Sequence, residues 1–284
     1  MSDTEHIEPA PVRPKKRFGQ HFLISPTVLD GILRMAELTS DDMVLEIGAG
    51  TGTLTEALAS RVRRLLAIEL DRELIMPLRR RFARQPQVEI IHADALQFDF
   101  APLDEPVKVV ANLPYSTAVP ILMRLLRAAS SLRLAVVMLQ REVAERLCAM
   151  PGTKAYGGLT VIAQWYAVVE KGFNVPPSAF SPPPKVISTV VKLTPRPQPP
   201  VPVDDEDWLF RVIRGGFGQR RKTLVNALGA AFPRQVEPHV LRQILAKVGI
   251  DARRRGETLT LVEYARLADA LREALHGGGE EIRG

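Results

Sequence analysis

The tetrapeptide Asn112-Leu113-Pro114-Tyr115 combines residue types that could activate an exocyclic amine. The N6 amine of adenine is a poor nucleophile because its lone pair is delocalised into the ring. Two acceptors on its hydrogens favour the nucleophilic form, and the Asn112 side-chain oxygen and the Pro114 carbonyl are candidates. Proline restricts its own backbone and that of Leu113, and the Tyr115 ring offers a surface for base stacking. The alternative interpretation is an Asn-x-Pro turn followed by a packing tyrosine.

A glycine-rich loop lies upstream of this tetrapeptide. The stretch 46–52 reads Glu-Ile-Gly-Ala-Gly-Thr-Gly, follows an apolar strand and precedes helical spacing from Thr53. Open doubly wound sheets hold their ligands at such helix N-termini. A dinucleotide-binding fingerprint would need glycine at position 53, where this chain has Thr53, so the loop does not match that fingerprint. The pattern, with Gly48 and Gly50 close to the ligand, resembles the S-adenosylmethionine loop of class I methyltransferases; the alternative is a tight strand-to-helix turn.

Two carboxylates are expected at neighbouring strand ends. Glu69 ends the strand 65–68 and could accept hydrogen bonds from both hydroxyls of an adenosine ribose. Asp94 follows the strand 88–91 and could accept from the exocyclic amine of the cofactor's adenine. Isolated acids at strand ends are often only helix caps. Because the carboxyl ends of parallel strands meet at one edge of a sheet, we expect both acids to share a cleft with the glycine loop and Asn112.

A proline-rich loop over residues 176–186 could bring a second ring to the target base. Its prolines are typical of a stiff, polyproline-like segment. Such a segment could project Phe180 over the cleft as the second face of a stacking clamp, which would make Phe180 part of the catalytic site. The alternative is a rigid connector with one buried phenylalanine.

The periodicity of the chain predicts the elements that position these residues. Apolar runs predict strands over 44–47, 65–68, 88–91, 107–111, 132–139, 166–169 and 186–193. Helical spacing predicts helices over 26–36, 120–128, 140–147 and 157–165, from Thr53 and from Arg72, and further helices within 204–276. The alternation of strands and helices predicts the α/β fold class, and with the glycine loop it resembles the Rossmann-like sheet of class I methyltransferases. We expect this sheet to be mostly parallel, with a last strand that is antiparallel and lies at an edge.

Composition shifts predict the domain organisation. We expect a disordered tail over 1–14, an S-adenosylmethionine-binding catalytic domain over 15–194 and a proline-rich linker over 195–203. A small all-helical domain over 204–276, for RNA or ribosome recognition, and a tail over 277–284 would follow. Two helix starts in the helical domain are signalled by the acidic cluster 204–207 and by a capping box of Thr260 and Glu263.

Charge and cysteine content bound the partners and the compartment. The chain has 284 residues and a net charge of +6, and its pI of about 9.7 favours an anionic partner. One cysteine, Cys148, excludes an internal disulfide and a multi-cysteine metal site, and the five histidines lack metal-ligand spacing, so no metal is expected. No apolar run approaches membrane-spanning length, and the N-terminus lacks an apolar signal core. We expect a cytoplasmic protein.

Three basic segments could contact nucleic acid. Residues 15–23 interleave basic and aromatic side chains, which suits nucleic-acid contact or a basic arm packed by its phenylalanines. The densest basic stretches are 219–222 and 253–255, and Arg220, Arg221 and Lys222 suit contacts to RNA phosphates. We expect Asp71 to cap the helix that begins at Arg72, and the arginines of that helix are more typical of a solvated face.

The same residues, taken together, resemble the small-subunit ribosomal RNA adenine dimethyltransferase (KsgA) family from about Lys16 to Leu271. The motifs that carry the resemblance are Phe18-Gly19-Gln20-His21-Phe22-Leu23, Glu46 to Gly52, Glu69-Leu70-Asp71, Asp94-Ala95, Asn112 to Tyr115, Leu139-Gln140-Arg141-Glu142, Phe180 to Val186, Gln219 to Leu224 and Arg255 to Leu259.

This resemblance implies transfer of two methyl groups from S-adenosylmethionine to N6 of each of two adjacent adenosines. They lie in a hairpin loop near the 3′ end of small-subunit (16S) rRNA, and the partner is the late-assembling 30S subunit. By the matching motifs, His21 and Leu23 would line the cofactor site together with Gly48, Glu69, Asp94 and Asn112. Many members of the family carry Asn where His21 stands.

Three other functions compete with this one. A related resistance-type enzyme methylates one adenine of large-subunit rRNA, but the 219–224 motif and the helical domain favour the small-subunit enzyme. Adenine-DNA methyltransferases usually have a second proline in place of Leu113. The chain could also act mainly as an assembly factor that binds immature subunits. No oligomer seam is apparent, so a monomer is the default expectation.

Overall fold

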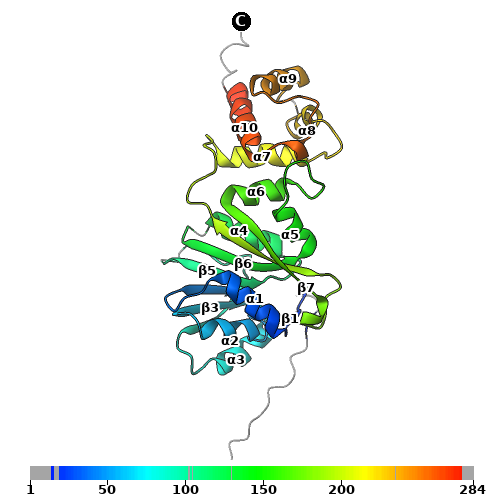
Figure 1. Ribbon diagram of the computed structural model, residues 1–284. Helices are drawn as coiled ribbons and strands as arrows, with labels where there is room; N and C mark the ends of the chain where they lie inside the picture. Colours follow the sequence, from blue (N-terminus) through cyan, green and yellow to red (C-terminus); the bar gives the residue numbers. More distant parts are fainter. Residues whose placement is uncertain are drawn as a thin grey trace, which may run out of the picture. The chain divides into compact units, whose positions relative to one another are not determined.

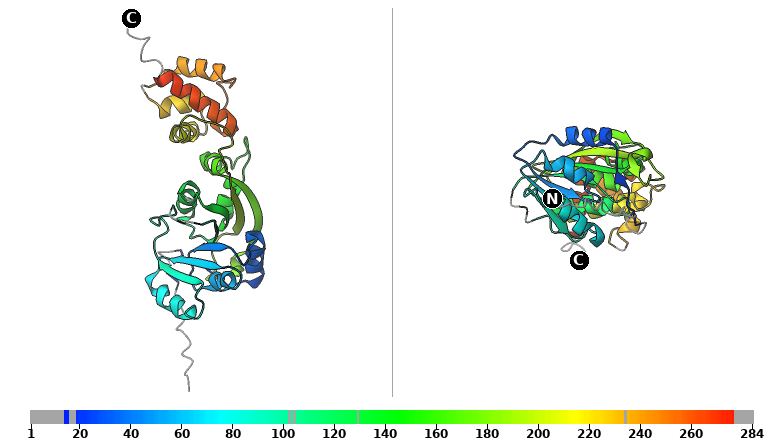
Figure 2. Two further views of the ribbon diagram at one scale, coloured as in Figure 1. Left: turned by 90° about the vertical axis from the view of Figure 1, so that its left-hand side faces the viewer. Right: turned by 90° about the horizontal axis from the view of Figure 1, so that it is seen from below.

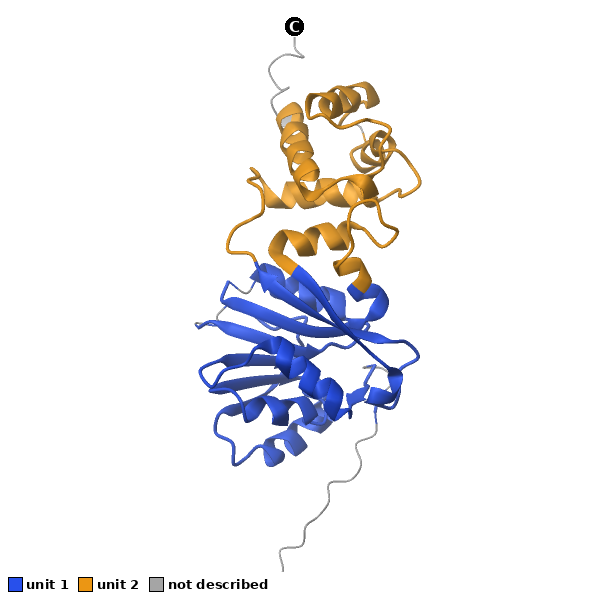
Figure 3. Ribbon diagram, in the orientation of Figure 1, with its two compact units in different colours: residues 1–144, 169–195 blue, residues 145–168, 196–284 orange. Residues whose placement is uncertain are grey.

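The computed structural model describes residues 14–15, 19–101, 103, 105–128, 130–233 and 235–276. The expected tails fall almost wholly outside these residues, as does Phe18 of the N-terminal motif. Two compact units make up the chain (Figure 3): the first comprises 1–144 and 169–195, the second 145–168 and 196–284. This division differs from the expected boundary near 195, since the segment 145–168 groups with the C-terminal helices.

A seven-stranded sheet forms the centre of the first unit, in the order β4-β3-β2-β5-β6-β9-β7 (Figure 1). The strands are β2 (Met43–Ile47), β3 (Arg64–Glu69), β4 (Val88–His92), β5 (Val107–Asn112), β6 (Leu132–Gln140), β7 (Ala167–Val175) and β9 (Ser188–Pro195). The pairs β2–β3, β2–β5, β3–β4 and β5–β6 are parallel, whereas β6–β9 is antiparallel. The expected α/β fold class is confirmed.

The expectation that the last strand lies at an edge is wrong. Strand β9 lies between β6 and β7, and β7 is the edge strand. The reason is visible in burial: the first four residues of β9 are all buried, which is typical of an interior strand. Strand β7 carries exposed residues along most of its length, including Glu170 and Lys171, as edge strands commonly do.

Helices cover both faces of this sheet. Those of the first unit are α1 (Pro26–Ala36), α2 (Thr53–Ala59), α3 (Arg72–Arg81) and α4 (Ala118–Ala128), and α5 (Arg141–Leu147) runs from the first unit into the second. The left view of Figure 2 shows α1 and α4 on opposite faces. Apolar side chains spaced along α1 and α4 are buried, which explains why these sequences form helices against the sheet.

A second, two-stranded sheet joins distant parts of the first unit. Strand β1 (Phe22–Leu23) pairs antiparallel with β8 (Phe180–Ser181). A short 3-10 turn, η2 (Pro177–Ala179), precedes β8. The expected polyproline-like loop is therefore shorter than the sequence indicated, and its centre is held by strand pairing to the segment before α1.

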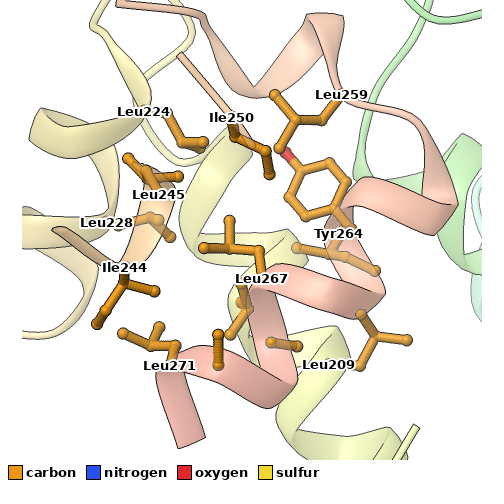
Figure 4. Close-up of a cluster of buried hydrophobic side chains, with 14 of the residues drawn as sticks. Leu209, Leu224, Leu228, Ile244, Leu245, Ile250, Leu259, Tyr264, Leu267 and Leu271 are labelled. Atoms are coloured by element: carbon orange, nitrogen blue, oxygen red, sulfur yellow. The ribbon is translucent and has the colours of Figure 1, made fainter. Parts of the chain in front are cut away.

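The second unit is helical. Its elements are α6 (Gly158–Tyr166), α7 (Glu206–Phe217), α8 (Leu224–Ala231), α9 (Pro238–Lys247), the 3-10 turn η3 (Gly256–Thr258) and α10 (Leu261–His276). Helix α8 contains Gly229. Buried leucines, isoleucines and Tyr264 converge between the helices (Figure 4). The segment 145–168 joins this core, because Tyr156 Oη donates to the Leu259 carbonyl at 2.8 Å and Trp165 Nε1 donates to Glu206 at 3.0 Å.

The helix starts predicted at the acidic cluster 204–207 and at the capping box of Thr260 and Glu263 are confirmed. Asp205 begins α7 and accepts from the Trp208 N–H at 2.9 Å. Thr260 Oγ1 accepts from the Glu263 N–H at 3.2 Å, while the Thr260 N–H donates to Glu263 Oε2 at 2.7 Å. Both caps satisfy N–H groups that would otherwise lack partners at a helix start. In the described part of the chain, no helix is both long and apolar enough to cross a membrane.

Candidate active site

A cavity of about 350 Å³ opens at the carboxyl ends of β2, β3 and β5 in the first unit. It gathers nearly all of the predicted catalytic and cofactor-binding residues. Those that line it are His21, Leu23, Gly48, Gly50, Glu69, Asp94, Asn112, Leu113, Pro114 and Tyr115. Phe180 does not line it. The parallel pairing of the strands explains the convergence, since their carboxyl ends meet at one edge.

The glycine loop follows a path that favours glycine. Gly48 and Gly50 have φ values of 82° and 57°, in the left-handed region that residues with a Cβ rarely adopt. A Cβ on Gly50 would also lie 3.1 Å from the Phe22 ring. The Gly48 N–H donates to the Ile68 carbonyl at 2.8 Å, which fastens the loop to the end of β3. The loop therefore presents bare backbone to the cavity.

Glu69 is the buried acid that fixes this loop. Its two carboxylate oxygens accept from the Gly50 N–H at 2.8 Å and from the Asp71 N–H at 2.7 Å. Burial raises the pKa of Glu69, and the two N–H groups oppose this shift by favouring the charged form. Each carboxylate oxygen keeps a further lone pair. Glu69 can therefore hold the loop and still accept from a ligand's hydroxyl groups.

Asp94 follows β4 at the same rim. Its Oδ1 accepts from the Leu96 N–H at 2.8 Å, which orients the carboxylate in the turn after the strand. The side chain lines the cavity and is partly exposed. No hydrogen bond to its other oxygen, Oδ2, is found among the described residues.

The orientation of the Asn112 amide is set by the N-terminal segment. Asn112 Nδ2 donates to the His21 carbonyl at 3.1 Å. Because the amide nitrogen is used in this bond, the oxygen Oδ1 is the atom that can accept from a ligand. The sequence-based assignment of Asn112 as an acceptor is compatible with this orientation.

The second acceptor has two candidates in the structure. The Pro114 carbonyl, expected from the sequence, already accepts from the Thr117 N–H at 3.1 Å and, over a longer distance of 3.5 Å, from the Thr117 hydroxyl. The Leu113 N–H donates to the Met138 carbonyl at 3.3 Å, whereas no backbone hydrogen bond to the Leu113 carbonyl is found among the described residues. The Leu113 carbonyl is therefore an alternative to that of Pro114.

Tyr115 and His21 form an aromatic pair at the cavity. Their ring centroids lie 5.7 Å apart and the ring planes differ by 30°. Tyr115 Oη lies 2.6 Å from Ser188 Oγ, and burial raises the pKa of the Tyr115 hydroxyl. His21 Nδ1 lies 2.7 Å from the Pro182 carbonyl, so the ring donates from this nitrogen. Both rings are thus anchored at one end.

Phe180 lies in the apolar core. Its side chain is 3% exposed and packs in a cluster that includes Leu23, Ala179 and Met138. The β1–β8 register places Leu23 opposite Phe180, which directs this position into the cluster. Phe180 therefore lies next to the cavity residue Leu23 but does not line the cavity itself, and the clamp proposed from the sequence stays a prediction.

Glu46 is a cavity residue that the sequence-based assignment left out. It is fully buried, and neither carboxylate oxygen has a hydrogen-bond partner among the described residues. Burial raises the pKa of Glu46 to about 8; the neighbouring Thr55 hydroxyl opposes this shift, and the nearby charge of Glu69 adds to it. An unpaired buried carboxylate is costly. The signal was present in the sequence, since Glu46 is the acidic residue that opens the acidic-x-Gly-x-Gly-x-Gly pattern.

Asp71 ties the N-terminal segment to the sheet. Its carboxylate caps α3 as predicted, by accepting from the Glu73 N–H at 3.1 Å. It also accepts from Lys15 Nζ at 2.7 Å and from Gln20 Nε2 at 3.0 Å. These contacts, between residues far apart in the sequence, hold the segment 19–23 that lines one side of the cavity. The helix cap was predicted from the sequence, whereas the contacts of Asp71 with Lys15 and Gln20 were not.

The predicted RNA-contacting residues lie in the second unit. Arg220, Arg221 and Lys222 are exposed and follow α7. Arg220 and Arg221 line a second cavity there, which Lys222 does not line. No group of three or more histidine, cysteine, aspartate or glutamate side chains in the described part of the chain could hold a metal ion.

The fold and the cavity define a class I methyltransferase. The family model for ribosomal RNA adenine dimethylase matches residues 12–267. The chain is 43% identical over 267 residues to the ribosomal RNA small subunit methyltransferase A of Alkaliphilus metalliredigens (strain QYMF), covering 92% of this chain and 93% of that protein. It is 44% identical over 266 residues to the protein of the same name from Anoxybacillus flavithermus (strain DSM 21510 / WK1), covering 90% of each.

Solved structures agree with these relationships. The chain is similar to a dimethyladenosine transferase from Plasmodium falciparum, with a TM-score of 0.77 and 29% identity, covering 87% of this chain and 96% of that one. It is also similar to the 23S rRNA methyltransferase ErmE, with a TM-score of 0.67 and 27% identity, covering 88% of this chain and 99% of that one. The chain belongs to the ribosomal RNA adenine dimethylase family. It is therefore an S-adenosylmethionine-dependent enzyme that methylates adenine in ribosomal RNA.

Proposed function

We propose that this enzyme dimethylates N6 of two adjacent adenosines in a hairpin loop near the 3′ end of 16S rRNA, in the cytoplasm, late in assembly of the small subunit. The observation that carries the proposal is the orientation of the Asn112 amide at the cavity. Its nitrogen donates a hydrogen bond to the His21 carbonyl, so its oxygen is the atom left to accept from a ligand. The full-length relatives named ribosomal RNA small subunit methyltransferase A support the choice of substrate.

The cavity residues fit S-adenosylmethionine, which supplies a methyl group on a positively charged sulfur. The unpaired buried carboxylate of Glu46 is suited to the cofactor's ammonium group, which would compensate its charge. Glu69 is suited to the ribose hydroxyls and Asp94 to the adenine amine. Gly48 and Gly50, without side chains, leave room for the ligand against the backbone. His21 and Leu23 would cover the cofactor from the N-terminal side.

The chain's own residues then act on the target adenosine. Asn112 Oδ1 accepts one N6 hydrogen, and the carbonyl of Pro114 or Leu113 accepts the other, which localises the lone pair on N6. Tyr115 orients the base by stacking. The proton released by the methylated amine goes to water, so no side-chain base is required. Arg220, Arg221 and Lys222 of the second unit are the candidates that the sequence offers for contacts to the RNA backbone.

The test is methyl transfer from labelled S-adenosylmethionine to small subunits purified from a strain that lacks this modification, followed by nucleoside mass spectrometry. We expect N6,N6-dimethyladenosine at two adjacent positions of 16S rRNA. Transfer only to large-subunit or protein-free RNA would contradict the proposal in favour of the resistance-type activity. Subunit binding without transfer would favour an assembly factor.

A further inference from the structure

The second unit contains a basic cavity of about 470 Å³ that the proposed catalytic chemistry does not use. Three segments that are far apart in the sequence contribute its lining. The residues are Gly152, Thr153, Lys154, Arg220, Arg221, Arg255 and Glu257. Four of these side chains are cationic and one is anionic. The cavity therefore has a net positive lining and is suited to an anion.

Arg220 connects the three segments. Its guanidinium donates to the Lys154 carbonyl at 2.7 Å and forms a salt bridge with Glu257 Oε2 at 3.3 Å. The Gly152 N–H donates to the Glu257 carbonyl at 2.8 Å, so the segments 152–154 and 255–257 are also joined directly. Glu257 is mostly buried, with a side chain 26% exposed, whereas the Arg220 side chain is 53% exposed. The positive charge of Arg220 is thus already compensated within the protein.

The other cations of the cavity lack such compensation. Lys154, Arg221 and Arg255 are exposed, and no ion pair of theirs is found among the described residues. Their sequence neighbours differ: Arg254 pairs with Glu263, and Arg253 pairs with Asp251 at 2.9 Å. In the run 253–255 the structure therefore separates Arg253 and Arg254, which have partners within the protein, from Arg255, which lines the cavity.

We propose that Lys154, Arg221 and Arg255 bind a backbone phosphate of the substrate RNA, and that the Arg220–Glu257 pair is a positioning device that holds these three cations around it. This inference rests on the proposed function, since it takes the RNA substrate as given. It changes the sequence-based assignment by giving Arg220 a positioning role and by adding Lys154 and Arg255. A phosphodiester is the chemical class that fits, because three separate cations can contact its two unesterified oxygens.

The first test measures binding of undermethylated small subunits to the full-length enzyme across a range of salt concentrations. We expect Lys154→Ala, Arg221→Ala and Arg255→Ala each to weaken binding several-fold and to lower the slope of log affinity against log salt by about one. The matched control is Arg253→Ala, which removes a cation from the same run but outside the cavity, and should leave the slope unchanged. Thermal unfolding verifies that each variant is folded.

The second test separates positioning from simple charge. Glu257→Gln removes a negative charge beside the cavity, so a purely electrostatic role predicts tighter RNA binding. The proposal predicts weaker binding, because Arg220 loses the partner that holds the loops together. The effects of Glu257→Gln and Lys154→Ala should also be non-additive in the double variant, since both act on one phosphate. Additive effects, or tighter binding by Glu257→Gln, would overturn the positioning role.

Failure of this inference is distinguishable from failure of the proposed function. If the unmodified enzyme dimethylates small subunits while all three cavity variants keep its slope, the pocket assignment is overturned and the function stands. If the unmodified enzyme neither binds nor methylates small subunits, both are overturned. Calorimetric titration with inorganic phosphate provides a further arm: phosphate binding that these variants abolish, with unchanged subunit binding, would assign the pocket to a small anion instead of RNA.

Discussion

The cavity of the first unit and the basic cavity of the second unit place charge in opposite ways. In the first, the acids lie at strand ends, and Glu46 and Glu69 are buried at 0% and 7% exposure. In the second, the cations lie in loops, and Lys154, Arg221 and Arg255 are exposed. One site is preorganised by the sheet, and the other by a few contacts between loops.

This difference follows from the ligands that we propose. A small cofactor can be enclosed, so buried carboxylates interact with it at low effective dielectric and are screened little by salt. A long polyanion cannot be enclosed, so exposed cations contact it one phosphate at a time and their effect depends on salt. The comparison predicts that variants of the first cavity change turnover, the pH dependence of stability and the affinity for the cofactor. Variants of the second should act on RNA affinity.

The largest expected effect is that of Asn112→Ala. Removing one preorganised polar group from a reacting centre typically lowers turnover by roughly 10²- to 10³-fold. We expect a loss of this size in single-turnover methyl transfer at saturating cofactor, with subunit binding retained. A loss below tenfold would show that Asn112 is not an acceptor for the amine. Loss of subunit binding would contradict the prediction that variants of the first cavity leave RNA affinity unchanged.

Glu46→Gln should change both the pH dependence of the free energy of unfolding and the affinity for the cofactor. The folded protein holds the Glu46 proton up to a pKa of about 8, whereas the unfolded chain releases it near 4.5. The folded state thus binds more protons between these values, and the free energy of unfolding falls as the pH rises through this window. The variant has no carboxylate to ionise, so without cofactor it should be more stable than the unmodified protein at pH 7.

Urea unfolding of both proteins from pH 5 to pH 8 measures this difference, and calorimetry measures cofactor affinity. We expect the stability curves to diverge with rising pH. The affinity of the unmodified enzyme should rise over the same window, because Glu46 must ionise to pair with an ammonium group, while the variant binds weakly throughout. Parallel stability curves would show that Glu46 is already ionised in the cofactor-free protein. They would contradict the prediction that cofactor affinity rises as Glu46 ionises.

Tyr115→Ala and Phe180→Leu test which ring contacts the base. Tyr115 lines the cavity, so its removal should weaken base placement by about 1–3 kcal/mol, the range for one aromatic–base stack. Phe180→Leu keeps most of the core volume and removes the ring, so we expect nearly unchanged kcat and KM, because Phe180 lies in the core. An equal loss in both variants would mean that Phe180 leaves the core when RNA binds, and would establish the clamp.

The smallest expected effects separate Arg254 from Arg253. Arg254 donates to Glu263 Oε2 at 3.1 Å and to the Thr258 carbonyl at 2.5 Å, so Arg254→Ala should destabilise the second unit by about 1–3 kcal/mol. The Arg253 side chain is 89% exposed, and its pair with Asp251 should contribute almost nothing to stability. Thermal unfolding measures both changes. A similar loss in the two variants would contradict the sorting of this run into structural and surface residues.

Most of the first cavity was predictable from sequence, because its residues follow strands whose apolar runs are local signals. Glu69, Asp94 and Asn112 each come at or just after the end of a strand, and parallel pairing brings such ends together without further information. The glycine loop was likewise predictable from the sequence, because its positive φ angles favour residues without a Cβ. The order of strands at the antiparallel edge was not predictable, because β7 and β9 both carry strand patterns.

Tertiary structure alone decided the rest. Phe180 is drawn into the core by the pairing of β8 with β1, two segments more than 150 residues apart, and the residues around Phe180 carry no local sign of that partner. The complete burial of the Glu46 carboxylate depends on the residues that surround it in three dimensions. In the two basic runs every arginine has the same chemistry, so only the positions of Glu257 and Glu263 separate structural cations from those that can bind phosphate.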